Sequence, residues 1–186
     1  MLLREQLQQK LSNKTKPPGS LGKLEELAIQ VGLVQKSLSP KLSHPQIVVF
    51  AGDHGIAATG KVNPYPQQVT AQMVHNFVQG GAAINVICQQ YGIGLTVVDA
   101  GVNASFDEAL PIVHAKIGRG TNDYSEGIAM HLEQAAAAIQ KGAAIVQEIH
   151  EKGCTLIGLG EMGIGNSSSA ALLMHYYTGI PIAACT

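Results

Sequence analysis

The 186-residue sequence predicts an α/β protein: a three-layer α/β/α arrangement with a mostly parallel, Rossmann-like sheet, preceded by a small helical segment. Short β-branched runs, the first being QIVVFA at Gln46–Ala51, alternate with longer helical patterns. Such alternation is typical of βαβ units. Glycine is abundant, with 21 residues, and aromatic residues make up only 4% of the chain, which suits many tight strand-to-helix turns.

The first 44 residues are expected to be helical and to precede the sheet. Leu3, Leu7 and Leu11 recur at helical spacing within residues 2–14, and a second apolar stripe runs to about Leu38. The proline- and glycine-rich segment Lys16–Gly22 separates the two helices.

A domain boundary is expected after residue 44, because Pro40 and Pro45 disfavour helix in the residues before them. Residues 45–186 are then a parallel α/β nucleotide-binding domain. Its final stretch, residues 180–186, is apolar and has no polar tail, so this domain is expected to be truncated at its C-terminus.

The elements of this second domain follow in a regular order. Strands are expected at residues 46–51, 95–99, 111–117 and 154–159, and helices at 67–91, 129–152 and 167–177, with Gly179 as the last C-cap. Right-handed crossovers place the loops after the strands at one sheet edge, where ligands of parallel sheets bind. These loops comprise residues 52–66, 100–109, 118–127 and 160–166.

Composition excludes several partner classes. A net charge of -1 and the absence of tryptophan give no basis for binding nucleic acid or an anionic membrane. The three cysteines, Cys88, Cys154 and Cys185, form no closely spaced pair, which indicates reduced thiols and a cytoplasmic protein. Asp53 and His54 lack a third ligand at metal spacing, so no metal site is expected.

The segment Gly158–Gly163 spells G-x-G-x-x-G ahead of a helix that begins with Ser167-Ser168-Ser169. A glycine turn at a helix N-terminus is suited to binding an anion, with a simple capped turn as the alternative. A dinucleotide would need an acidic residue about 20 positions later, and none follows Glu161. Glu161 itself either bonds loop amides or faces a ribose, a cationic ring or a transferable proton.

Two further loops hold candidate residues. Asp53 and His54 follow the first strand, where Asp53 is suited to bracing the loop by bonding its backbone. The stiff segment Asn63–Gln68 (NPYPQQ) either walls a flat heterocycle or is a rigid turn before a helix. The seven histidines are scattered, and no Ser-His-Asp or Cys-His arrangement is evident.

Six segments, in order, resemble motifs of the nicotinate-nucleotide:dimethylbenzimidazole phosphoribosyltransferase family of cobalamin synthesis. They cover nearly the whole chain and match the family over about its N-terminal half. They are KPPGSLGKLE at Lys16–Glu25, FAGDHG at Phe50–Gly55, VNPYPQQVT at Val62–Thr70, VVDAGV at Val97–Val102, RGTN at Arg119–Asn122 and GLGEMGIGNS at Gly158–Ser167.

The resemblance implies transfer of 5-phosphoribose from nicotinate mononucleotide to dimethylbenzimidazole without a cofactor. A homodimer is expected, because apolar surface would be exposed where the missing half of the family's chain packs. The resemblance also implies a supporting carboxylate at Glu161, with the main general base beyond Thr186. The other implied roles are a phosphate and ribose cradle (Gly163, Gly165, Asn166, Ser167, Ser168), an aglycone wall (Asn63, Tyr65, Gln67) and loop-organising residues (Asp53, His54, Asp99).

This sequence departs from the family in length, because members are considerably longer and carry that base in their C-terminal half. The 186-residue chain is therefore expected to be an inactive or nearly inactive fragment. Two alternatives stay open: a non-catalytic nucleotide- or base-binding or oligomerising fragment, and an NAD-dependent oxidoreductase, which the missing acidic residue disfavours.

Overall fold

The computed structural model describes residues 2–186 and divides into two compact units, the first ending at Leu42 and the second spanning Ser43–Thr186. The first unit is a helical pair, α1 (Leu3–Ser12) and α2 (Lys23–Val34). Both helices are shorter than the sequence predicts. Gly32 of α2 lets Leu7 of α1 pack against the helix, because a Cβ at Gly32 would overlap the leucine methyl groups.

The loop between α1 and α2 contains the KPPGSLGKLE segment. Lys16 Nζ donates to Glu25 Oε1 at 2.8 Å, and the Leu21 N–H donates to the same oxygen at 3.1 Å. These hydrogen bonds, with the Lys16 charge, lower the pKa of the Glu25 carboxyl below its usual value. Within this unit the motif therefore has a structural role: it fastens the loop to the first turn of α2.

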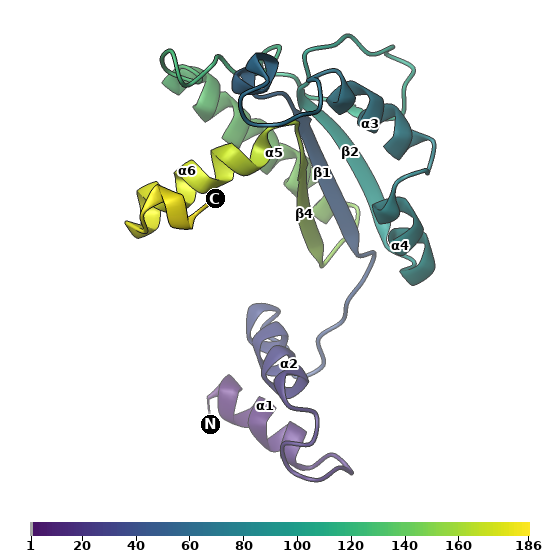
Figure 1. Cartoon of the computed structure of the whole chain (residues 1–186). Coiled ribbons are helices and arrows are strands. Elements are labelled where there is room, and N and C mark those ends of the chain that lie inside the picture. The colour runs from purple at the N-terminus through teal and green to yellow at the C-terminus, as the bar shows by residue number, and fades with distance from the viewer. Residues whose placement is uncertain (1) are drawn as a thin grey trace. The chain divides into compact units, whose positions relative to one another are not determined.

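The second unit is a parallel α/β domain (Figure 1). Its strands are β1 (Gln46–Gly52), β2 (Gly94–Gly101), β3 (Val113–His114) and β4 (Ile157–Met162), in the order β3-β2-β1-β4. All three strand pairs among the described residues are parallel. The helices are η1 (Gly55–Thr59), α3 (Val69–Val78), α4 (Ala83–Tyr91), α5 (Leu132–Glu151), α6 (Asn166–Thr178) and η2 (Ile182–Ala184).

Successive side chains of β1 alternate between two hydrophobic clusters, one on each face of the sheet. Val49 and Ala51 pack with Val74 and Phe77 of α3, while Val48 packs on the other face in a separate cluster. That second cluster includes Ile145 and Ile149 of α5. The predicted three-layer α/β/α class is confirmed, with α3 and α4 on one face and α5 on the other (Figure 1).

Several element boundaries differ from the predictions. The single helix expected at 67–91 is two helices, because Gly80 has a φ of +80° and leaves the helical region. Asn85 then begins α4 by donating to the Phe77 carbonyl at 2.8 Å and accepting the Ala82 N–H at 3.2 Å. The strand expected at 111–117 is reduced to the two residues of β3, since Pro111 has no N–H for a sheet ladder.

The last strand also begins later than the predicted 154–159. Cys154 is buried beneath α5, where its N–H donates to the Ile149 carbonyl, and the Thr155 N–H donates to the Ser43 carbonyl at 3.0 Å. Pairing with β1 then starts at Ile157 and continues to Met162. Gly179 does end α6 as predicted, with a φ of +71°. In residues 2–186 no helix has the length and apolarity needed to cross a membrane.

Candidate active site

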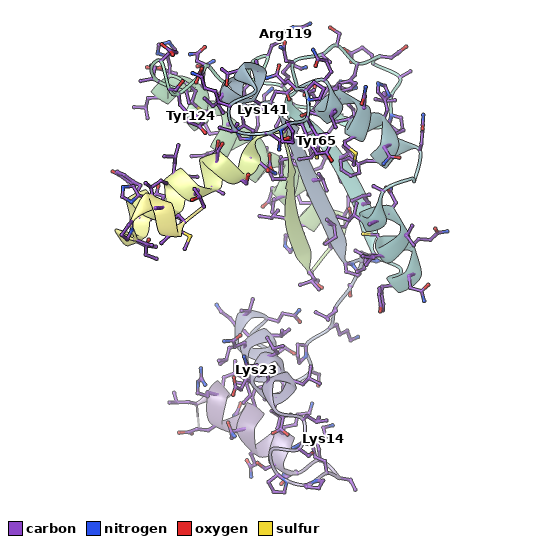
Figure 2. The ribbon with its side chains drawn as sticks, in the orientation of Figure 1. Lys14, Lys23, Tyr65, Arg119, Tyr124 and Lys141 are labelled. Atoms are coloured by element: carbon purple, nitrogen blue, oxygen red, sulfur yellow. The ribbon has the colours of Figure 1, made fainter. Side chains whose placement is uncertain are left out.

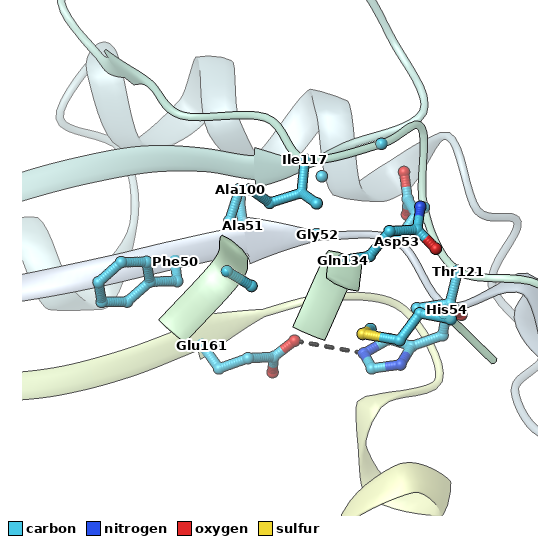
Figure 3. A pocket seen from close by; sticks show the side chains of 15 residues that line it. Phe50, Ala51, Gly52, Asp53, His54, Ala100, Ile117, Thr121, Gln134 and Glu161 are labelled. Carbon is cyan, nitrogen blue, oxygen red and sulfur yellow. Dashed lines mark hydrogen bonds and ion pairs between the residues drawn. The ribbon is translucent and has the colours of Figure 1, made fainter. Parts of the chain in front are cut away.

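A pocket of about 240 Å³ lies at the carboxyl ends of β1, β2 and β4, on the face that α5 covers (Figure 3). Apolar side chains from three elements and a loop line it: Phe50, Ala51, Ala100, Ile117, Met130 and Ala138. Its polar groups come from Asp53, His54, Thr121, Gln134 and Glu161. An apolar cavity with a few polar groups suits a small, flat organic molecule.

Glu161 is placed at this pocket by the register of the edge strand. It pairs with Phe50 of β1, so its side chain leaves the sheet on the α5 face. One carboxylate oxygen lies 3.4 Å from His54 Nε2, and the other accepts a hydrogen bond from the Asn166 side-chain amide (Figure 3). The side chain is 47% exposed, so the carboxylate remains accessible to a ligand.

Of the three glycines of G-x-G-x-x-G, Gly163 alone lies in the turn that the motif suggested. Gly158 and Gly160 lie inside β4, opposite Ile47 and Val49 of β1. A Cβ at Gly158 would overlap the Ile47 side chain, and one at Gly160 would come within 3.3 Å of Val49 Cγ2. These two glycines therefore make room for β1 side chains, and the predicted loop starting at residue 160 begins only after Met162.

The proposed phosphate and ribose residues lie at the N-terminus of α6. Gly163 and Gly165 are buried in the turn, and Gly165 has a φ of +87°. Asn166 begins the helix and holds Glu161, while Ser167 is exposed. The positive end of the helix dipole favours an anion here.

Several hydrogen-bond donors of this proposed phosphate and ribose site already donate to other groups of the protein. The Asn166 N–H donates to the Gly163 carbonyl at 3.1 Å, and the Ser168 N–H donates to the Gly165 carbonyl at 3.2 Å. The Ser168 hydroxyl donates to the Gly165 carbonyl and accepts from the Tyr124 hydroxyl, both at 2.6 Å. An anion would have to share or displace some of these donors.

The proposed aglycone residues lie together in the loop before α3, outside the lining of the 240 Å³ pocket. The Asn63 side chain accepts the Tyr65 N–H at 2.8 Å, which closes a local turn. Tyr65 is 63% exposed, among the side chains at the loop end of the sheet (Figure 2). Gln67 is a brace: its amide donates to the His54 carbonyl and accepts from Asn103, both at 3.1 Å.

Asp53 and Asp99 each connect a strand to the loops beyond it. Asp53 accepts the Asn103 N–H at 2.7 Å through its side chain and the Thr121 N–H at 3.0 Å through its carbonyl. Its second carboxylate oxygen is buried and has no hydrogen-bond partner within residues 2–186. Asp99 accepts the Val102 N–H at 2.9 Å and forms an ion pair with Lys116 at 3.0 Å.

Sequence reasoning did not identify several residues of this site. Thr121 lines the pocket and accepts the Gly55 N–H at 3.1 Å, and its place in the RGTN segment was the only available indication. Gln134 lines the pocket from α5 without any motif. Ser169 contacts the His54 ring, 115 positions away in the chain, so no local pattern could pair them.

The described part of the chain contains no group of three or more His, Cys, Asp or Glu side chains able to hold a metal ion. The site is therefore built from one accessible carboxylate, a histidine, amide and hydroxyl groups, and a helix N-terminus. Such groups can bind a phosphorylated or planar ligand and accept a proton from it.

The chain is similar to known proteins over nearly its whole length. A family model described as "Phosphoribosyltransferase" matches residues 2–186. The nicotinate-nucleotide–dimethylbenzimidazole phosphoribosyltransferase of Dechloromonas aromatica is 55% identical over 179 residues, which are 96% of this chain and 51% of that protein. The protein of the same name from Phocaeicola vulgatus is 46% identical over 183 residues, 98% of this chain and 53% of its own length.

The fold of the chain is also similar to that of a solved structure. The phosphoribosyltransferase of the same description from Thermus thermophilus superposes with a TM-score of 0.91 at 37% identity, covering 96% of this chain and 54% of that one. The chain thus spans about half the length of the curated relatives that it matches. With the family model, the relatives and the fold in agreement, this chain belongs to the nicotinate-nucleotide–dimethylbenzimidazole phosphoribosyltransferase family.

Proposed function

We propose that this chain supplies the substrate-binding half of an enzyme that transfers 5-phosphoribose from nicotinate mononucleotide to dimethylbenzimidazole, forming α-ribazole phosphate for the lower ligand of cobalamin. One observation carries the proposal. The Glu161 carboxylate has a side-chain nitrogen near each of its oxygens, lines an apolar pocket and lies five residues before the first residue of α6. A carboxylate, an apolar slot and a helix N-terminus are the three groups that this transfer needs.

The chemistry explains why each group is needed. A nitrogen of the base attacks C1′ of the ribose, and the bond from C1′ to the pyridinium nitrogen breaks. Its electron pair neutralises the pyridinium ring, which makes nicotinate a good leaving group without a metal or pyrophosphate. The proton on the second nitrogen of the base must leave as the new bond forms, and a carboxylate can accept it.

The substrates are assigned to parts of the site as follows. The single phosphate and the ribose lie at the α6 N-terminus, among Gly163, Gly165, Asn166, Ser167 and Ser168. The base occupies the apolar pocket and approaches Glu161. Tyr65 is exposed and free to cover a flat ring, while Asn63 and Gln67 hold its loop in place.

The isolated 186-residue chain is proposed to be inactive or nearly so. The main general base is expected outside this sequence, and the chain spans about half the length of its relatives. Glu161 then acts as the supporting carboxylate. Formation of ribazole phosphate by this chain, at a rate comparable with that of a full-length relative in the same chromatographic assay, would contradict this assignment.

Binding provides the sharper test because it does not require turnover. Calorimetric titrations with nicotinate mononucleotide and with dimethylbenzimidazole should each be made on the unaltered chain, on Glu161→Gln and on Glu108→Gln. Glu108 is an exposed glutamate outside the pocket and is the matched control. We expect the base to bind roughly tenfold more weakly to Glu161→Gln only. Equal affinities for all three proteins would remove Glu161 from the site.

A second candidate is a non-catalytic binding or oligomerising fragment, and one observation favours its oligomeric form. Helix α6 exposes large apolar side chains, including Leu173 at 57%, Tyr176 at 79% and Tyr177 at 78%. Such a surface is suited to covering by another polypeptide, and we propose a homodimer. Self-association of the chain without binding of either substrate would favour this second candidate over the first.

The remaining assignments follow from composition. We place the protein in the cytoplasm, because Cys88, Cys154 and Cys185 are free thiols. Nucleic acid and membranes are not proposed as partners of a chain with a net charge of -1. The NAD-dependent oxidoreductase hypothesis loses support, since two of the three glycines that suggested it, Gly158 and Gly160, lie inside β4.

A further inference from the structure

His54 links three elements that carry the site. It follows β1, and its ring lies between β4 and α6, with Nδ1 2.9 Å from Ser169 Oγ and Nε2 3.4 Å from Glu161 Oε1. Its carbonyl accepts the Gln67 amide at 3.1 Å and the Ala57 N–H at 3.0 Å, so the backbone beneath the ring is held as well. The side chain is 19% exposed.

The two partners determine which ring nitrogen carries the proton. An ionised carboxylate only accepts hydrogen bonds, so Nε2 must donate toward Glu161. A neutral imidazole has a single N–H, which leaves Nδ1 as an acceptor. Ser169 must therefore donate its hydroxyl proton to Nδ1.

The surroundings of Ser169 agree with this direction. A serine in a helix commonly donates to the carbonyl four residues earlier, which for Ser169 is that of Gly165. That carbonyl already accepts the Ser168 hydroxyl at 2.6 Å and the Ser168 N–H at 3.2 Å. The Ser169 hydroxyl is instead directed to the His54 ring.

The absence of a side chain at Gly163 allows this arrangement. A Cβ at that position would overlap the Gly52 carbonyl oxygen and would come within 2.7 Å of Glu161 Oε1 and 3.0 Å of His54 Cδ2. The turn after β4 can therefore pass close to the Glu161 and His54 side chains. Asn166 holds the second oxygen of the carboxylate from the start of α6.

We propose that His54 is a positioning residue for Glu161: Ser169 holds the imidazole in its Nε2–H form, and His54 directs the carboxylate of Glu161 into the pocket. The importance of this positioning for phosphoribose transfer rests on the proposed function. The proton arrangement itself does not, because it concerns only side chains of this chain.

The test measures the ring nitrogens of His54 in the ¹⁵N-labelled chain by long-range ¹H–¹⁵N NMR at neutral pH, with His54→Gln to assign the signals. We expect the Nε2–H tautomer in the unaltered chain. Ser169→Ala should produce a mixture of tautomers, and Ser169→Thr, which retains the hydroxyl, should restore the single form. Ser167→Ala is the matched control, since Ser167 lies in the same helical turn and is exposed.

Two results would overturn the proposal. One is an Nδ1–H or doubly protonated ring in the unaltered chain, a result that requires no variant to fold. The other is an unchanged His54 spectrum in a folded Ser169→Ala protein. Adding dimethylbenzimidazole then separates this inference from the proposed function. An Nε2–H ring whose signals do not respond to the base supports the positioning arrangement and counts against the proposed site.

Discussion

Asp99 is a buried carboxylate that forms an ion pair with a lysine outside its own strand. It is 2% exposed, and Lys116 supplies the opposite charge at 3.0 Å while also donating to the Val102 and Ala104 carbonyls. Removing one member of such a pair leaves an uncompensated charge, which costs more than the pair contributes.

Lys116→Met should therefore lower the free energy of unfolding by about 3 kcal/mol, measured by urea denaturation. Lys152→Met is the matched control, because it also removes a lysine from a carboxylate, Glu148, but both side chains are more than half exposed. The control should leave the free energy of unfolding almost unchanged, because an exposed ion pair contributes little. Similar losses in both variants would show that Asp99 does not depend on Lys116.

Gly163 is a second position at which a substitution should change stability, because the structure leaves no room there for a side chain. Gly163→Ala should destabilise the chain by about 1–3 kcal/mol, because its Cβ overlaps the Gly52 carbonyl oxygen. Gly127→Ala, where a Cβ meets no atom within 4 Å, should have little effect. Thermal denaturation of the two variants compares them directly, and an equally stable Gly163→Ala would mean that the turn relaxes freely.

Individual site residues were predictable only where they share a segment. Glu161, Asp53 and His54 were identified from short motifs, and the structure brings all three to one pocket. Ser169 and Gln134 were not identified, because their proximity depends on how α5 and α6 cross the sheet ends. The roles assigned to the phosphate and aglycone residues stay predictions.

At the scale of elements, the Lys16–Glu25 ion pair joins the α1–α2 loop to α2 and makes the stability of this helical pair depend on pH. Lys16 lowers the pKa of Glu25, so the folded form is favoured above the unfolded-state pKa and this stabilisation is lost as pH falls through the folded-state pKa. Glu25→Gln should lower the thermal midpoint of the α1–α2 unit at pH 7, and this difference should shrink as the pH falls below the usual pKa of a carboxyl group.

Amide NMR signals of residues 3–34 in the full chain report this midpoint. Glu26→Gln is the control, since Glu26 is the neighbouring exposed carboxylate. A loss that does not shrink as the pH falls, or one that Glu26→Gln reproduces, would exclude the Lys16–Glu25 contact as its source.

Helices and strands were predictable where the periodicity of apolar residues determines the element. Their boundaries were less predictable where a single residue or contact determines them. The alternation of short apolar runs with helical patterns predicted the parallel sheet correctly. The break between α3 and α4 depends on the positive φ of Gly80, and the start of β4 depends on the burial of Cys154. Neither is visible in the periodicity of the sequence.

At the scale of the whole molecule, α6 presents an apolar surface that the described chain leaves exposed. It extends away from β4 (Figure 1), and Leu173, Tyr176 and Tyr177 share one side of it at helical spacing. Replacing all three by glutamine should weaken self-association at least about tenfold in sedimentation velocity experiments, since about 1.4 kcal/mol of apolar contact suffices for that change.

The matched control replaces Val86, Ile87 and Tyr91 of α4 by glutamine, which are similarly large and 55–73% exposed. It should leave association unchanged. Equal weakening in both triple variants, or a monomeric parent chain at all concentrations, would contradict assembly through α6.

The edge position of β4 has an electrostatic consequence. Within the described chain β4 pairs with β1 alone, and Glu161 near its end is 47% in contact with water. At a separation of 4 Å, the attraction between unit charges rises from about 1 kcal/mol in water to about 4 kcal/mol near a protein surface. A polypeptide laid along this edge would remove that water, so assembly would strengthen the attraction of Glu161 for a cationic substrate without moving any atom of the site.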